Sequence, residues 1–308
     1  MEPKQKNIIT LRDIPLREIS SYINWTYFFS AWKITGNYDG IEDVCTCPSC
    51  ETAFLQKSEN REKATEALQL FRDARQLLSE IIENNMLSTN AVFCIIKATS
   101  ENEGIIFYPN DNTNGVYIPM LRQQQAKETA YHLSLADFVS PTNDYAGIFA
   151  ISISGADEWR NKYESSNDIY KSLLIQTIAD RLAEATAEWL HKQIRKTYWG
   201  YAPDENLSIR ELFKSRYQGI RPAVGYPSLP DQSVIFTLNK ILDVGSIGIS
   251  ITENGAMYPT SSICGLLFAH PQSAYFVIGK IGEDQLNDYA DRKGIDVEET
   301  KKWLSTLL

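Results

Sequence analysis

The stretch from Tyr217 to Pro230 combines one arginine with aromatic side chains in a loop rich in proline and glycine. It reads Tyr-Gln-Gly-Ile-Arg-Pro-Ala-Val-Gly-Tyr-Pro-Ser-Leu-Pro. Prolines and glycines at this density exclude a regular helix and disfavour a central strand, so we expect an extended, tightly specified loop. In such a loop Arg221 could bind a carboxylate, and the rings of Tyr217 and Tyr226 could hold a flat group beside it. The alternative is a surface crossing that only joins a helix to a strand.

Three cysteines lie close together in Cys45-Thr-Cys-Pro-Ser-Cys50. Thiolates at this spacing suit zinc or an iron–sulfur cluster. The motif offers three ligands, whereas a closed structural zinc site takes four, so Cys94 or His132 would have to supply the fourth. We favour a variable loop over residues 40–58 and assign no metal there. The chain has five cysteines and no secretion signal, which argues against a disulfide framework.

Glu188-Trp-Leu-His191 has the Glu-x-x-His spacing of carboxylate-bridged metal sites. Such sites need more than one copy of the motif, and the sequence has one. We therefore expect a solvated acidic edge of a helix, with Glu188 paired to Lys192.

Length, charge and hydropathy limit the possible functions. The chain has 308 residues, of which 43% are hydrophobic, a net charge of −9 and a pI of about 5.0. The negative charge argues against nucleic acid as a partner. There is no apolar run of about twenty residues, so we expect no membrane span and no membrane partner. We expect a soluble cytoplasmic protein that forms one domain over residues 1–308, with residues 1–15 as a leader.

The elements that position these residues follow from hydrophobic periodicity. The segment 16–32 is dense in aromatic residues that we expect to anchor the core, with Asn24 as its polar exception. Helices are predicted at 59–85, 167–196, 234–242, 283–293 and 297–307, the last two hinged at Gly294. Strands are predicted at 91–98, 104–108, 115–119, 144–155, 244–252, 263–269 and 274–281. A turn at 110–115 should make a hairpin of 104–108 and 115–119, and 263–269 should pair with 274–281 as another.

This order of elements indicates an α+β fold around a mainly antiparallel sheet, not a regular alternation of strands and helices. The sequence contains no Gly-x-Gly-x-x-Gly dinucleotide fingerprint and no P-loop.

Several long strings of the chain are shared with one known family. They are Ile23-Asn-Trp-Thr-Tyr-Phe-Phe, Arg195-Lys-Thr-Tyr-Trp-Gly-Tyr-Ala-Pro-Asp-Glu-Asn-Leu, Tyr217-Gln-Gly-Ile-Arg-Pro-Ala-Val-Gly-Tyr-Pro and Asp288-Tyr-Ala-Asp-Arg-Lys-Gly. On these strings the chain resembles the reactivation domain of cobalamin-dependent methionine synthase, which binds S-adenosylmethionine. The resemblance extends from about Ile19 to Leu304 and implies a single C-shaped α+β domain with a twisted antiparallel sheet.

The resemblance also implies a function in methionine biosynthesis. In this family the cofactor is occasionally oxidised to inert cob(II)alamin, and reductive methylation restores it. The electron comes from a flavodoxin-like donor and the methyl group from S-adenosylmethionine. The chain lacks the other modules of the complete enzyme, so we expect a free-standing subunit of a methyltransferase. It would act on a cobalamin-binding methionine synthase or another corrinoid protein.

The residues that would bind S-adenosylmethionine follow from the same resemblance. Arg221 would bind the methionyl carboxylate, and Glu184 would help with the amino group. The backbone of the Arg-Pro-Ala-Val-Gly-Tyr loop would hold the nucleoside. The full set is Asn24, Glu184, Arg221, Ala223, Gly225, Tyr226, Tyr275 and Phe276. We expect no catalytic side chain, since the cobalt of the partner's cobalamin is the nucleophile.

The chain departs from the family at three places. The family has an aspartate where this chain has Asn24 and a glutamate where it has Ser215. After the Pro-Asp pair the family continues His-Thr-Glu-Lys, and this chain continues with Gln232-Ser-Val-Ile. An alternative function is therefore a non-catalytic module that docks on a corrinoid protein and has lost S-adenosylmethionine binding.

Overall fold

The computed structural model describes residues 2–5, 7–45, 47–109, 114–125 and 131–308. The chain folds into two compact units. The sheet unit comprises Met1–Arg12, Asn90–Ser152 and Ala187–Leu308. The helical unit comprises Asp13–Thr89 and Ile153–Thr186. Each unit is described by itself below.

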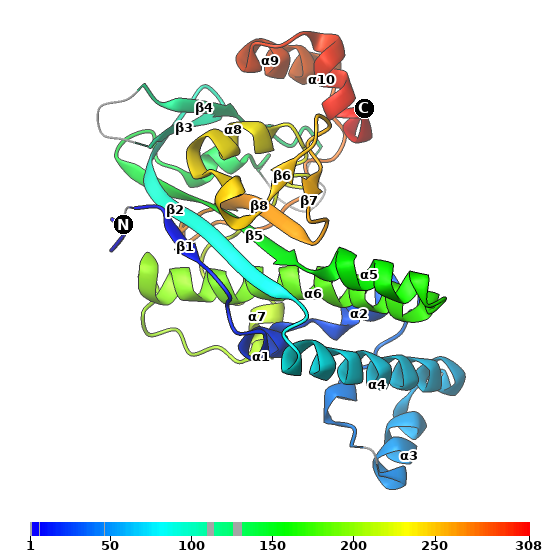
Figure 1. Ribbon diagram of the computed structural model, residues 1–308. Helices are drawn as coiled ribbons and strands as arrows, with labels where there is room; N and C mark the ends of the chain where they lie inside the picture. The colour runs from blue at the N-terminus through cyan, green and yellow to red at the C-terminus, as the bar shows by residue number, and fades with distance from the viewer. Residues whose placement is uncertain (1, 6, 46, 110–113, 126–130) are drawn as a thin grey trace. The chain divides into compact units, whose positions relative to one another are not determined.

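Within the described residues, six strands of the sheet unit form one sheet, in the order β4-β3-β2-β5-β8 with β1 also on β2 (Figure 1). The pairs β1–β2, β2–β3, β3–β4 and β5–β8 are antiparallel. The strands are β1 (Ile9–Leu11), β2 (Ser88–Glu101), β3 (Gly104–Tyr108), β4 (Val116–Pro119), β5 (Asp144–Ser154) and β8 (Ser262–Leu267). The predicted hairpin of β3 and β4 is confirmed, although residues 110–113 of its turn lie outside the described residues. Residues expected to form a leader contribute strand β1.

The core of the sheet unit is built by the alternating apolar residues of these strands and by helix α8 (Val234–Leu242). Phe107, Ile148 and Leu238 are fully buried in this cluster. The two remaining cysteines, Cys94 and Cys264, belong to it as well. A smaller apolar cluster contains Tyr289 and the neighbouring face of helix α9. The closing helices are α9 (Glu283–Lys293) and α10 (Val297–Trp303), separated at Gly294 as predicted.

The helical unit contains the predicted long helix as α4, which runs over Arg61–Glu83. Its apolar stripe is buried, and the ring of Phe71 packs edge-on against Trp25 with centroids 4.7 Å apart. Phe28 and Phe29 are buried as the aromatic pattern predicts, whereas Tyr27 is exposed. The other helices are α1 (Leu16–Ile19), α2 (Trp25–Ala31), α3 (Pro48–Lys57), α5 (Ala156–Ser165) and α6 (Ile169–Gln193), of which α6 continues into the sheet unit.

Helix α3 corrects the loop predicted over residues 40–58. Cys47 is its N-cap residue, and Pro48 follows at the first helical position. Proline is favoured there because its fixed φ suits the helix and its missing N–H would have no helical partner. Leu55 is buried, and Glu51 forms an ion pair with Arg72 of α4 at 2.8 Å. The sequence of this segment is too polar to suggest a helix. The helix is stabilised by its N-cap and by packing on α4.

Two predicted strands are wrong. Residues 274–281 form no strand, because the edge of β8 that they would need is already bonded to residues 220–224. Instead the Ile278 N–H donates to the Pro227 carbonyl at 3.0 Å. In the segment 244–252, residues Val244–Ile247 form a 3-10 turn. Gly248 then takes a φ of +80°, which leaves β6 (Ser250–Ile251) as a two-residue strand paired with β7 (Met257–Tyr258).

The predicted fold class, α+β with a mainly antiparallel sheet, is confirmed. In the described part of the chain, no helix has both the length and the apolar character needed to cross a membrane.

Candidate functional site

The loop predicted around Arg221 runs antiparallel to strand β8 in the sheet unit. Four backbone hydrogen bonds of 2.9–3.0 Å join it to β8 and the residue after it: Ile220 N–H to Phe268 O, Phe268 N–H to Ile220 O, Leu266 N–H to Pro222 O and Val224 N–H to Cys264 O. Pro222 has no N–H to donate and takes part through its carbonyl, which suits a position at a sheet edge. We call residues 220–224 the edge segment. It is extended, as predicted, and its backbone is fixed by the sheet.

Close approach of two backbones holds the edge segment in place. A Cβ atom at Gly265 of β8 would lie 2.4 Å from the Pro222 carbonyl oxygen and 2.8 Å from the Ala223 Cα. Glycine is therefore the residue that lets the edge segment lie against this strand at the observed distance.

A tight turn follows the edge segment. Gly225 has a φ of +83°, and its N–H donates to the Leu229 carbonyl at 2.8 Å. The Leu229 N–H in turn donates to the Tyr226 carbonyl at 2.9 Å. These bonds place Tyr226 at the tip of the turn, where 46% of its surface is exposed. The side chain of Gln232 lies beside the turn, since a Cβ atom at Gly225 would come within 2.4 Å of its Oε1, and its amide donates to the Gly255 carbonyl at 2.8 Å.

Arg221 makes a contact to a carboxylate and another to a tyrosine hydroxyl. Its Nη2 donates to Glu188 Oε2 at 2.7 Å, and its backbone N–H donates to the Tyr275 hydroxyl oxygen at 3.1 Å. The side chains of Arg221 and Glu188 are 17% and 7% exposed. The predicted solvated edge with a Glu188–Lys192 pair is therefore wrong, because Glu188 is buried and its bonded cation is Arg221. Burial of a carboxylate requires such a partner.

A second ion pair lies on the same helical face. Arg195 is fully buried, and its Nε and Nη2 each lie 2.7 Å from an oxygen of Glu205. The ring of Tyr217 covers the guanidinium at 4.1 Å. His191 packs edge-on against this ring with centroids 5.0 Å apart. Burial, together with the nearby Arg195 and Arg221, lowers the pKa of His191 well below its usual value, so its imidazole is neutral at pH 7.

Sequence reasoning missed the role of Arg195. One signal was present, since Glu188, His191 and Arg195 are three and four residues apart and so share one helical face. The α6 helix ends at Gln193 and continues as a π-helical turn over Ile194–Tyr198. Single π-helical turns are often found at functional sites.

Asp231, which follows the loop from Tyr217 to Pro230, is anchored to α9. Asp231 is 1% exposed and accepts hydrogen bonds from the Tyr289 hydroxyl at 2.7 Å and from the Ser233 backbone at 2.9 Å. The Lys293 ammonium completes the ion pair with Asp231. The loop therefore has a buried ion pair at each end. Its first residue, Tyr217, packs on Arg195 of the Arg195–Glu205 pair, and Asp231 of the Asp231–Lys293 pair follows its last residue.

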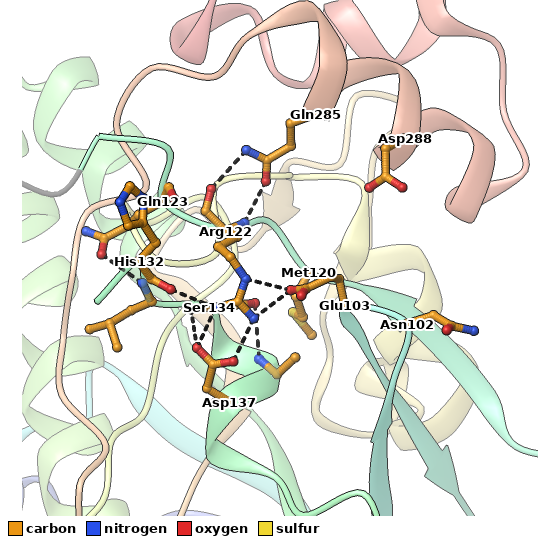
Figure 2. A network of polar contacts seen from close by, with 12 residues as sticks. Asn102, Glu103, Met120, Arg122, Gln123, His132, Ser134, Asp137, Gln285 and Asp288 are labelled. Carbon is orange, nitrogen blue, oxygen red and sulfur yellow. Dashed lines mark hydrogen bonds and ion pairs between the residues drawn. The ribbon is translucent and has the colours of Figure 1, made fainter. Parts of the chain in front are cut away.

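A separate polar cluster surrounds Arg122 (Figure 2). All five guanidinium donors of Arg122 are used, by the carboxylates of Glu103 and Asp137 and by the His132 carbonyl, at 2.7–2.9 Å. Its backbone N–H and carbonyl bond the Gln285 amide at 2.7 and 2.9 Å. A cavity of about 300 Å³ lies beside this cluster. Because the guanidinium is saturated by protein groups, we assign the cluster to anchoring α9.

Comparisons with known proteins agree with this geometry. The family model "Vitamin B12 dependent methionine synthase, activation domain" matches residues 15–294. The chain belongs to this family. A solved structure, "Crystal Structure of the MetH Reactivation Domain bound to AdoHcy", is similar with a TM-score of 0.88 at 35% sequence identity. The match covers 100% of this chain and 92% of that one.

Five of the eight residues that the resemblance predicts to bind S-adenosylmethionine lie close together in the sheet unit. In the sheet unit the structure brings together Arg221, Ala223, Gly225, Tyr226 and Tyr275 through the bonds described above. Tyr275 is 44% exposed, like Tyr226. Phe276 is half-buried and packs against Phe138 with ring centroids 6.2 Å apart. It therefore contributes to the core more than to a surface wall.

Asn24 and Glu184 belong to the helical unit, and their predicted binding roles stay predictions. The Asn24 side chain accepts the Thr26 N–H at 3.1 Å and so caps α2. Glu184 is half-buried on α6, one helical turn before Glu188. Of the other departures from the family, Ser215 has a φ of +50° in the turn after α7 (Ile209–Phe213).

Proposed function

We propose that this activation-domain chain binds S-adenosylmethionine and supports reductive methylation of cob(II)alamin, in a methionine synthase or a related corrinoid protein. The observation that carries the proposal is the edge segment, which presents Arg221 from a backbone fixed on β8, with the partly exposed Tyr275 bonded to its N–H and the partly exposed Tyr226 on the turn that follows. A ligand with a carboxylate and a flat base suits this combination. The AdoHcy named with the similar solved structure supports the same ligand class.

In the proposed reaction, a flavodoxin-like donor supplies one electron to the cobalt(II) of the partner's cobalamin. The reduced cobalt attacks the methyl carbon of S-adenosylmethionine, a cobalt–carbon bond forms, and the carbon–sulfur bond breaks to release S-adenosylhomocysteine. The chain supplies no nucleophile, so its contribution is binding and orientation of the sulfonium.

Each side chain of the site then has a role that its contacts support. The Arg221 guanidinium binds the methionyl carboxylate. The 2.7 Å bond from Arg221 to Glu188 fixes the orientation of the guanidinium. The backbone of Ala223 and the rings of Tyr226 and Tyr275 hold the nucleoside, and the Gly225 turn sets the position of Tyr226.

Isothermal titration of the chain with S-adenosylmethionine and S-adenosylhomocysteine tests the proposal. We expect a dissociation constant in the micromolar range, which corresponds to about −8 kcal/mol. Arg221→Ala should weaken binding at least about tenfold, since a hydrogen bond to a charged group contributes about 1.5–3 kcal/mol. Arg216→Ala is the matched control, because Arg216 is exposed and lies five residues earlier. Unchanged affinity of Arg221→Ala would disprove the role assigned to Arg221.

A control for folding is needed because Arg221→Ala leaves the buried Glu188 without the guanidinium that it bonds. The double variant Glu188→Gln and Arg221→Met removes both charges at once, and such a replacement is often neutral for stability. It should therefore keep a normal unfolding temperature and still fail to bind S-adenosylmethionine.

The second candidate is a docking module that recognises a corrinoid protein without S-adenosylmethionine. It is favoured by the observation that Arg221 is already bonded to a carboxylate of the chain itself. The departures from the family at Asn24, Ser215 and Gln232 add to it. The absence of heat at millimolar S-adenosylmethionine would support this candidate, and Asn24→Asp with Ser215→Glu should then create binding. Asparagine and aspartate cap helices equally well, so the first change keeps the cap of α2.

A further inference from the structure

The cysteine motif in the helical unit has no part in the proposed function. The Sγ atoms of Cys45, Cys47 and Cys50 all lie within 4.8 Å of one another. Cys45 Sγ and Cys47 Sγ are 2.9 Å apart, which is longer than a disulfide bond of about 2.05 Å. Three thiols, contributed by six consecutive residues, therefore converge on one point.

The start of helix α3 positions these thiols. Cys47 is the N-cap residue, and its Sγ accepts the backbone N–H of Cys50 at 3.3 Å. Pro48 restricts the backbone between the two cysteines. Helix α3 is itself fixed on α4 by the buried Leu55 and by the Glu51–Arg72 ion pair at 2.8 Å. The positions of Cys47 and Cys50 are thus set by the start of helix α3.

Packing does not explain the three cysteines. Cys45 and Cys50 are exposed, whereas Cys94 and Cys264 are 1% exposed in the core of the sheet unit. A cysteine that serves as a small apolar residue is normally buried, as Cys94 and Cys264 are. Clustered exposed thiols instead suit metal binding or redox chemistry.

We propose that Cys45, Cys47 and Cys50 form a three-thiolate site for a thiophilic cation of the zinc class, with the fourth position open to solvent. Zinc binds thiolate sulfur at about 2.3 Å, and tetrahedral geometry then separates the sulfurs by about 3.8 Å. Small rotations of these side chains bring the observed separations to that value. In the described part of the chain, the protein offers three ligand atoms at this point, one sulfur from each cysteine. Three protein ligands with one open position are typical of reactive zinc sites.

The competing chemistry is a dithiol pair in Cys47-Pro-Ser-Cys50, which has Cys-x-x-Cys spacing. A dithiol needs two sulfurs. Cys45 Sγ lies 2.9 Å from Cys47 Sγ and competes with Cys50 for it, so three convergent sulfurs favour a metal over a disulfide.

Cobalt(II) titration of the reduced, metal-free full chain under argon tests the site. We expect a sulfur-to-cobalt charge-transfer band that saturates at one equivalent and disappears when zinc is added. Each of Cys45→Ser, Cys47→Ser and Cys50→Ser should weaken zinc binding by more than about tenfold, because even outer-shell partners of metal ligands change affinity by about 10–100-fold. Thr52→Ala is the matched control on the same helix, because the Thr52 hydroxyl donates to the Pro48 carbonyl at 2.8 Å, and it should bind zinc like the unaltered chain.

Thiol labelling gives a second readout that does not depend on S-adenosylmethionine. Zinc should protect Cys45, Cys47 and Cys50 from a thiol reagent in the folded chain. Absence of the cobalt band, or equal zinc affinity in the triple serine variant, would overturn the proposal. So would a Cys47–Cys50 disulfide that forms equally fast with and without zinc. None of these results bears on the Arg221 titration, so the two proposals succeed or fail separately.

Discussion

The substitution Gly265→Ala tests whether the sheet positions the proposed ligand-binding residues. The added Cβ would lie 2.4 Å from the Pro222 carbonyl oxygen, whereas ordinary contacts begin at 3.4 Å. The two nearest atoms are backbone atoms of Pro222 and Ala223, which cannot rotate aside as a side chain can, and the ring of Phe149 follows at 2.9 Å. The edge segment must therefore move by about 1 Å, and Arg221 moves with it.

The expected magnitude follows from this displacement. A charged hydrogen bond of about 2.8 Å that lengthens by about 1 Å is no longer a hydrogen bond. Its loss corresponds to about 1.5–3 kcal/mol, or roughly a 10- to 150-fold rise in the dissociation constant for S-adenosylmethionine. Overpacking should also lower the free energy of unfolding by about 1–3 kcal/mol.

Isothermal titration and urea unfolding of the same preparations provide the assay. Gly245→Ala is the matched control, since the nearest atom to its added Cβ is a carboxylate oxygen of the Asp243 side chain at 3.2 Å, which can move. The control should bind and unfold like the unaltered chain. If Gly265→Ala also binds S-adenosylmethionine with unaltered affinity, the close approach of the edge segment does not position Arg221, and the reasoning is refuted.

Two further predictions concern the buried charges. Glu205→Gln leaves Arg195 buried without its carboxylate and should lower the free energy of unfolding by about 3–5 kcal/mol. The control Glu298→Gln removes an exposed ion pair and should have no measurable effect. Equal unfolding midpoints of the two variants would contradict the role of the buried pair. Burial, with Arg195 nearby, lowers the pKa of His191, so below about pH 6.5 the unfolded chain binds a proton that the folded chain does not, and stability should fall from pH 7 to pH 5. Thermal unfolding across this range should show a shallower fall in His191→Gln and the original fall in the control His270→Gln; an unchanged fall in His191→Gln would exclude His191 as its source.

Elements whose signal is local were predictable from the sequence. The apolar stripe of α4 and the alternating residues of β3 and β5 carry their own periodicity, and these elements appear where they were predicted. The segment 274–281 has a β propensity like that of β3 and β5, but it forms no strand. Its conformation depends on whether an edge of β8 is free, and no local pattern contains that information.

The site was predictable in part for the same reason. The loop chemistry identified Arg221 and Tyr226, and the structure places Arg221 on the edge segment and Tyr226 on the turn that follows it. The Arg221–Glu188 ion pair joins residues 33 positions apart, so helical periodicity alone placed Glu188 on the wrong side of α6. The spacing of Glu188, His191 and Arg195 could have shown that three polar residues share one face. It could not have shown that this face is buried.

The edge segment also has a consequence for the solubility of the chain. An uncovered outer edge of β8 would present unpaired N–H and C=O groups to other molecules, and such edges promote aggregation. Residues 220–224 cover this edge with the same backbone bonds that place Arg221. Any change that releases the edge segment from β8 would expose the edge of this strand, so variants that lose ligand binding through that release should also precipitate on expression. Selection against aggregation would then preserve the loop geometry even in a relative that no longer bound a ligand.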